Sequence, residues 1–156
     1  MKFTLDTNIL IHKGRNDDIW KHVKETYFSK GVKNFGIISF AAQAEVRAFA
    51  KKLKWGKPKL EQLEKLLSQL DIVHSDAKHL EKFYIQIDNY SQNQHKSLSL
   101  PTKLTARNMG KNDLWIAATA AVYNAPLIST DRDFQHLDNV FLSLRYIDTD
   151  QIRNPK

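Results

Sequence analysis

The chain has 156 residues, enough for one domain with a buried core, and its 42% apolar and 26% charged residues are ordinary for a globular protein. It has no cysteine, which excludes disulfides and thiolate metal sites, and no apolar run near the roughly 20 residues that span a bilayer. A net charge of +7, from 24 Lys and Arg against 17 Asp and Glu, favours a polyanionic partner, nucleic acid before membrane.

Two kinds of segment alternate along the chain. Short runs of apolar and β-branched residues predict five strands, at residues 2–6, 35–38, 71–74, 126–129 and 142–147. Apolar residues at three- and four-residue spacing predict helices between them, at residues 16–30, 39–53, 58–70, 75–87, 113–123 and 131–137. We interpret Thr7 and Asn8 as a turn, and Ser39 and Asn112 as helix caps.

This alternation predicts an α/β fold, because parallel neighbouring strands need crossover connections that helices supply. We expect one domain over residues 1–150, with a central parallel sheet of about five strands flanked by helices, and a frayed tail at 151–156. The stretch 89–111 is polar and interrupted by Pro101, which indicates a loop or extension. No charged-then-apolar leader opens the chain, so we expect a cytoplasmic protein.

Two acids follow predicted strands. Asp6 ends the first strand and Asp131 comes after the fourth, with Asp133 a weaker candidate for the same place. Taken singly, Asp6 could make a turn and Asp131 could cap a short helix. In parallel sheets, however, binding sites collect beyond the carboxyl ends of the strands, where both of these acids are expected.

Two further acids lie on helices that we expect to pack beside those strands. The residues three and four positions from Glu45 are Ala41, Ala42, Ala48 and Phe49, which predicts a small apolar face around its carboxylate. A lone buried carboxylate is costly unless it is paired or bound to metal. Asp113 lies in the first turn of a helix whose following residues, 114–121, carry no charge, and the helix dipole alone is reason enough for an acid there.

Four acids at one edge of a sheet would repel one another unless a cation lay between them. With oxygen ligands and no cysteine, such a site suits Mg²⁺ or Mn²⁺ rather than zinc. The sequence therefore predicts a divalent metal site formed by Asp6, Glu45, Asp113 and Asp131.

The chain also resembles the PIN-domain nucleases, and more narrowly the VapC-type toxins of type II toxin–antitoxin systems. The resemblance covers nearly the whole chain in the order expected for that family. The matching segments are residues 5–10 (LDTNIL), Ser39 with residues 44–46 (AEV), residues 112–120 (NDLWIAATA) and residues 129–134 (STDRDF).

This resemblance implies that Asp6 and Asp113 are the principal ligands of Mg²⁺ or Mn²⁺, completed by Glu45 and Asp131 directly or through water. It implies that the polar residues Asn8, Ser39 and Thr130 position the acids or the substrate phosphate. It further implies an endoribonuclease that leaves a 5′-phosphate and a 3′-hydroxyl, a cognate antitoxin partner, and a homodimer. The extension at 89–111 departs from more compact relatives.

We interpret the chemistry as metal-assisted hydrolysis of RNA, with one or two ions lowering the pKa of the attacking water. Glu45 is the candidate to assist deprotonation of that water, or it acts only as a ligand. Positive charge should surround such a site, and the sequence offers two groups. They are Arg47, Lys51, Lys52 and Lys54 after Glu45, and Lys96, Lys103, Arg107 and Lys111 before Asp113.

Other interpretations stay open. A stand-alone RNA-processing nuclease would need no antitoxin, and a non-cleaving module would bind RNA or protein through the same fold. A haloacid-dehalogenase-like phosphatase also has an Asp after its first strand, but that chemistry needs a second Asp two residues later, where this chain has Asn8.

Overall fold

The computed structural model describes residues 1–73 and 77–154. The predicted strand end at His74 and helix start at Ser75 and Asp76 lie outside the described residues. The strands are β1 (Lys2–Leu5), β2 (Phe35–Ser39), β3 (Asp71–Val73), β4 (Leu127–Ser129) and β5 (Leu144–Tyr146). The helices are α1 (Thr7–Arg15), α2 (Asp18–Tyr27), α3 (Phe40–Lys52), α4 (Lys57–Leu67), α5 (Ala77–Ser91), α6 (Lys111–Val122), the 3₁₀ helix η1 (Arg132–Leu137) and α7 (Thr149–Arg153).

The five strands form one sheet in the order β3-β2-β1-β4-β5, and every neighbouring pair is parallel. Phe3 is in register with Gly36, and Thr4 is in register with Leu127. β1 therefore lies at the centre, with β2 and β4 on either side. This confirms the α/β fold and the parallel five-stranded sheet that the sequence predicts.

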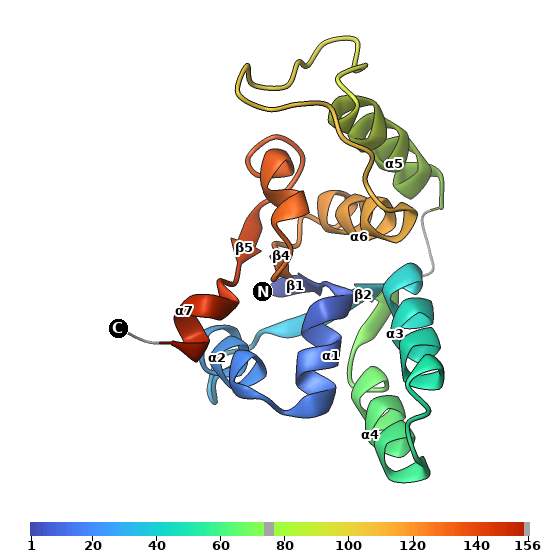
Figure 1. Cartoon of the computed structure of the whole chain (residues 1–156), viewed down its shortest axis with the longest axis vertical. Coiled ribbons are helices and arrows are strands. Elements are labelled where there is room, and N and C mark those ends of the chain that lie inside the picture. The colour runs from blue at the N-terminus through green and yellow to red at the C-terminus, as the bar shows by residue number, and fades with distance from the viewer. Residues whose placement is uncertain (74–76, 155–156) are drawn as a thin grey trace.

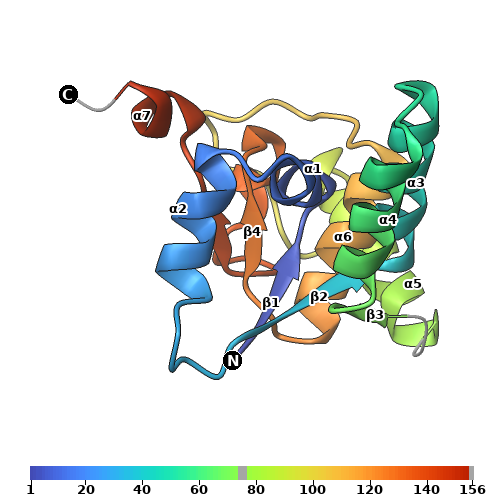
Figure 2. The same ribbon diagram turned by 90° about the horizontal axis from the view of Figure 1, so that it is seen from below.

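Helices cover both faces of the sheet (Figures 1 and 2). On one face Phe3 packs against the rings of Tyr27 and Phe28 at the end of α2. On the other face Ile37 belongs to a buried cluster with Leu80 of α5 and Ala118 of α6. After Asp113 the helix α6 carries no charge, and it is buried along most of this stretch, as its sequence predicts.

Gly36 marks the closest packing within the sheet. A Cβ atom on this residue would lie 2.8 Å from Leu70 Cδ2 and 3.0 Å from Leu5 Cδ1. Both leucines are buried, so an added methyl group would have to displace packed side chains. The position therefore requires a residue without a side chain, for reasons of space.

Three local predictions are wrong. Thr7 and Asn8 do not make a turn but begin α1, which is held in place by its fully buried residues Ile9 and Leu10. The N-cap of α6 is Gly110, not Asn112, because the helix starts two residues earlier than predicted. The tail expected to fray from residue 151 begins inside α7, which is capped by the Asp148 side chain.

Among the described helices, none has the length and apolar character needed to cross a membrane.

Substituting Gly36→Ala should lower the free energy of unfolding by roughly 1–3 kcal/mol, because the added methyl group overpacks the core. Gly14→Ala is the matched control: it lies in α1, and its new Cβ would be 3.7 Å from Trp55, an ordinary contact. The control should be neutral or stabilising by up to about 1 kcal/mol. Urea unfolding of both variants measures the difference, and equal stability would contradict the packing argument.

Candidate active site

Asp6 and Asp131 lie just beyond the carboxyl ends of the neighbouring strands β1 and β4. Asp6 is the N-cap residue of α1, and Asp131 is the N-cap residue of η1. The Asp131 carboxylate accepts a hydrogen bond of 2.8 Å from the backbone N–H of Asp133. Because the two strands are paired in parallel, both acids are brought to the same edge of the sheet.

Ser129, the last residue of β4, connects these two acids. Its fully buried hydroxyl donates to Asp6 Oδ2 at 2.7 Å and accepts from the backbone N–H of Asp131 at 2.9 Å. One side chain thereby orients the Asp6 carboxylate and the start of η1 together. The sequence analysis did not single out Ser129, and its only signal there is a hydroxyl residue ending a strand beside an acid.

Glu45 reaches the site from α3 through a contact with α1. The Thr7 hydroxyl donates to Glu45 Oε2 at 2.6 Å, which holds the carboxylate against the first turn of α1. The prediction of a buried apolar face around Glu45 is wrong, because Glu45 is half-buried and Ala48 is exposed. Thr7 is a second functional candidate that the sequence analysis missed, since it was interpreted as part of a turn.

Asp113 lies in the first turn of α6 and is half-buried. A Cβ atom on Gly110 would lie 2.7 Å from Asp113 Oδ2, so the carboxylate occupies space that any other residue at 110 would fill. Gly110 has φ of −59°, a conformation open to every residue type. The absence of a side chain at Gly110 thus allows the carboxylate to turn back over the helix start.

Two carboxylates of the site have raised pKa values and therefore hold their protons to higher pH than usual. Burial raises the pKa of Asp6 to about 7, with smaller contributions from the charges of Asp113 and Asp131, against the lowering effect of the Ser129 hydrogen bond. Burial also raises the pKa of Asp113 to about 6, followed by repulsion from Asp131, Glu45 and Asp133. The structure therefore brings all four predicted acids, together with Asp133, within electrostatic reach of one another.

This donor set suits a hard divalent cation. Its ligand atoms are carboxylate oxygens supported by hydroxyls, and a cation would stabilise the ionised carboxylates against the burial and the repulsion that raise both pKa values. In the part of the chain that the structure describes, no group of three or more acidic or imidazole side chains is arranged to hold a metal ion. Mg²⁺, however, keeps several of its waters and typically binds through only one or two protein carboxylates. The residues present fit such an ion.

The three polar residues predicted to position the acids or substrate lie in different settings. Ser39 is fully buried, and its hydroxyl accepts from the Ala42 N–H at 3.0 Å, so it caps α3. Asn8 and Thr130 are half-buried and follow Thr7 and Ser129 directly in the chain. The observed side-chain hydrogen bonds to Glu45 and Asp6 come from Thr7 and Ser129 instead.

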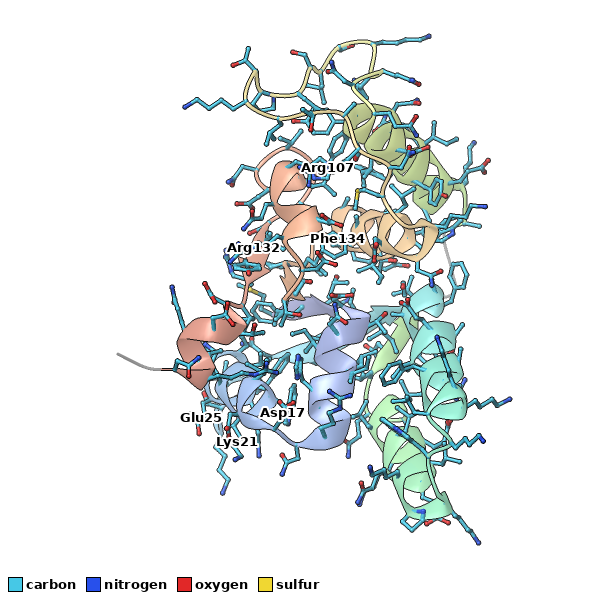
Figure 3. The ribbon with its side chains drawn as sticks, in the orientation of Figure 1. Asp17, Lys21, Glu25, Arg107, Arg132 and Phe134 are labelled. Atoms are coloured by element: carbon cyan, nitrogen blue, oxygen red, sulfur yellow. The ribbon has the colours of Figure 1, made fainter. Side chains whose placement is uncertain are left out.

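Some of the predicted basic residues lie near the acids and others do not. Arg47 forms a two-bond ion pair with Glu64 of α4, at 2.9 and 2.6 Å, and is directed away from the acids. Lys51 is exposed on α3, roughly 120° around the helix from Glu45. In contrast, Arg107 Nη1 lies 3.6 Å from Asp133 Oδ1, and the exposed Lys111 is two residues from Asp113. Of the second group, Arg107 thus adjoins the acids, and Figure 3 shows it beside η1.

Comparisons with known proteins agree with this geometry. A family model described as PIN domain matches residues 3–140. VapBC2 from Rickettsia felis, solved bound to a DNA fragment from its promoter, gives a TM-score of 0.70 at 24% identity and covers 95% of this chain and 100% of that one. VapBC-1 from nontypeable Haemophilus influenzae gives 0.68 at 25% identity over 94% and 98%. FitAcB from Neisseria gonorrhoeae gives 0.61 at 18% identity over 92% and 96%. No curated protein matches the chain in sequence.

In metal-free buffer, the free energy of unfolding should fall as the pH rises from about 4 to about 7. Folded Asp6 keeps its proton up to a pKa of about 7, whereas the unfolded chain loses it near 3.8, so the folded state binds more protons across this window. The ionised carboxylate then costs on the order of 4 kcal/mol above pH 7, at about 1.4 kcal/mol per unit of pKa difference.

Asp6→Asn should therefore stabilise the metal-free protein at pH 7.5 and flatten its pH dependence, as measured by urea unfolding in EDTA. Asp71→Asn, at an exposed acid that begins the edge strand β3, is the matched control and should leave the slope unchanged. A loss of stability in Asp6→Asn at pH 7.5 would contradict the electrostatic account.

Gly110→Ala should displace the Asp113 carboxylate without unfolding the protein, because the close contact is with the end of a flexible side chain. Misplacing a reacting group by about 1 Å can cost roughly a hundredfold in rate, so nuclease activity should fall by that order. Gly56→Ala is the matched control: Gly56 also caps a helix, and the nearest atom to its new Cβ would be 3.9 Å away. Equal activity in the two variants would show that Gly110 has no role in placing Asp113.

Proposed function

Because the chain belongs to the PIN domain family, we propose that residues 1–150 form a Mg²⁺- or Mn²⁺-dependent endoribonuclease that hydrolyses RNA phosphodiester bonds. The observation that carries the proposal is the buried Asp6 carboxylate, whose pKa is raised to about 7 beside Asp113 and Asp131. Groups with such perturbed pKa values cluster at functional sites. A divalent cation bound between these carboxylates would offset their mutual repulsion.

In this proposal Asp6 and Asp113 hold the ion, and Asp131 and Glu45 complete the site directly or through water. A bound ion of this kind neutralises phosphate charge and lowers the pKa of a water molecule. Ser129 holds the Asp6 carboxylate in one orientation through its 2.7 Å hydrogen bond. Asp133 faces Arg107 and so contributes to the rim of the site.

Glu45 is the residue we assign to the transfer of the water proton. Thr7 donates to its Oε2, which fixes the orientation of the carboxylate and leaves Oε1 available to accept a proton. Glu45 is only half-buried, so water reaches it from solvent. Attack by water at phosphorus with the 3′-oxygen as the leaving group, which takes up a proton, gives products with a 5′-phosphate and a 3′-hydroxyl.

The RNA backbone would approach across the extension between α5 and α6. Arg107 lies beside Asp133, and Lys111 is exposed in the first turn of α6, so we assign the positive charge near the acids to these two residues, while Arg47 is neutralised by Glu64. Asn8 and Thr130, half-buried next to the residues that orient the acids, are the polar groups left to contact the scissile phosphate. Binding through these cations should weaken steeply with added salt.

We further propose that the protein is the toxin of a cytoplasmic toxin–antitoxin pair. The similar structures from Rickettsia felis and Haemophilus influenzae are VapBC complexes, and that from Klebsiella pneumoniae is called a toxin–antitoxin complex. An antitoxin that inserted a basic side chain among the acids would relieve the same repulsion as a metal ion. A short open reading frame beside the gene would favour this role over a stand-alone processing nuclease.

A homodimer is supported by an exposed apolar face on α3, α5 and α6. Phe40 packs on Trp115 with ring centroids 5.4 Å apart yet remains 41% exposed, and Ile85 is 50% exposed. Self-association would bury these exposed apolar side chains of α3 and α5. We therefore assign this face to self-association.

Asp113→Asn should reduce Mg²⁺-dependent RNA cleavage by at least about a hundredfold, since a bound metal supplies several kcal/mol of transition-state stabilisation. Asp6→Asn should do the same, and Asp71→Asn should cleave like the original protein. The assay is gel analysis of single-stranded RNA with Mg²⁺ and with EDTA. Full activity in both site variants, or cleavage in EDTA, would overturn the proposal.

A further inference from the structure

The segment between α5 and α6 has an unusual charge pattern. Residues 92–111 contain four cations, Lys96, Lys103, Arg107 and Lys111, and no acidic residue. The segment extends outward from α5 and doubles back above η1 before it enters α6 (Figure 1). Leu100 and Met109 are its buried residues. A basic segment anchored in this way next to an acidic site is placed to meet a polyanion.

The root of this segment is fixed by Ser91 at the end of α5. The Ser91 carbonyl accepts from the Arg107 N–H at 2.8 Å, and its hydroxyl lies 3.3 Å from Met109 Sδ and 2.7 Å from His136 Nε2. His136 belongs to η1, so one buried serine joins α5, the returning chain and η1. The geometry around Arg107 is therefore built into the fold.

Beside this root lies an open cavity of about 230 Å³ at the surface, with a mainly polar lining. Four of its five residues carry carboxamide or guanidinium groups, and the fifth is an alanine. The lining residues are Gln92, Gln94, Ala106, Arg107 and Asn108. Paired donors and acceptors on planar groups match the edges of nucleic acid bases.

Some polar groups of the lining already have protein partners, and others do not. Gln92 Nε2 donates to Asp88 Oδ1 at 2.8 Å, which leaves Gln92 Oε1 as an acceptor. Arg107 pairs with Asp133 through Nη1 at 3.6 Å, which leaves other N–H groups of the guanidinium to donate elsewhere. Within residues 1–73 and 77–154, the structure shows no protein partner for the carboxamides of Gln94 and Asn108.

The cavity is connected to the acids by short paths. Arg107 lines the cavity and lies beside Asp133, whose N–H donates to Asp131 at 2.8 Å. Along the chain, Asn108 is five residues before Asp113. A nucleotide adjacent to the scissile phosphate would therefore reach this cavity.

We propose that this cavity binds one unpaired guanine base of the RNA and so determines where the proposed nuclease cuts. Guanine offers two adjacent acceptors, O6 and N7, that suit the Arg107 fork, and this is the commonest specific contact between proteins and bases. Guanine also carries N–H donors, and Gln92 Oε1 is an acceptor able to meet them. The carboxamides of Gln94 and Asn108 supply further donors and acceptors for the edge of the base. The inference rests on the proposed function only in assuming an RNA substrate.

The test compares four 5′-labelled single-stranded RNAs that differ only in one base next to a single cleavable linkage. We expect the guanine RNA to be cut on the order of tenfold faster than the other three, with the preference lost in Gln94→Ala/Asn108→Ala and in Arg107→Lys. Gln135→Ala is the matched control, because Gln135 is an exposed carboxamide on the neighbouring η1 outside the cavity. This control should keep the preference.

A second measurement separates failure of this inference from failure of the nuclease proposal. Fluorescence anisotropy in EDTA gives the affinity of the intact protein for the same four RNAs without cleavage. Tighter binding of the guanine RNA that Gln94→Ala/Asn108→Ala abolishes supports the cavity even if no RNA is cut. Equal binding of all four bases, a preference for another base, or a guanine preference that survives in the double variant would overturn it.

Discussion

Repulsion among carboxylates at the carboxyl edge of the sheet is the constraint on which this structure depends. Asp6 is nearly fully buried at the end of the central strand; burial raises its pKa to about 7, and the nearby charges of Asp113 and Asp131 add to that rise. An acid in such a place lowers the stability of the metal-free fold at neutral pH. A bound cation would offset this loss of stability, and we base the proposed metal site on that argument.

Other elements hold the acids in place despite this repulsion. The Ser129 hydroxyl ties Asp6 to the start of η1, and the Thr7 hydroxyl ties Glu45 to α1. Gly110 leaves room for the Asp113 carboxylate. These contacts come from four different segments of the chain, and the parallel sheet brings them together. The extension between α5 and α6 then adds positive charge on one side, where a polyanionic substrate would enter.

The sequence predicts the sheet and the acids well because both follow from local patterns: strands that end in acids, and an uncharged helix that must be buried. It misses α1, because Thr7 and Asn8 favour turns and the helix is held by the burial of Ile9 and Leu10, a tertiary effect. It misplaces Glu45 in an apolar face, because the small residues around it do not reveal which side of α3 is covered. The roles of Ser129, Thr7 and Ser91 depend on contacts across more than fifteen positions in sequence or between separate elements, which no local pattern carries.

Anomalous diffraction from crystals of the protein grown with Mn²⁺ tests the central claim most directly, because it locates the ion without relying on activity. The account predicts an anomalous peak within coordination distance of the Asp6 and Asp113 carboxylates, and its loss in crystals of Asp113→Asn. A protein that takes up Mn²⁺ only elsewhere, or a peak at this place that persists in Asp113→Asn, would contradict the account.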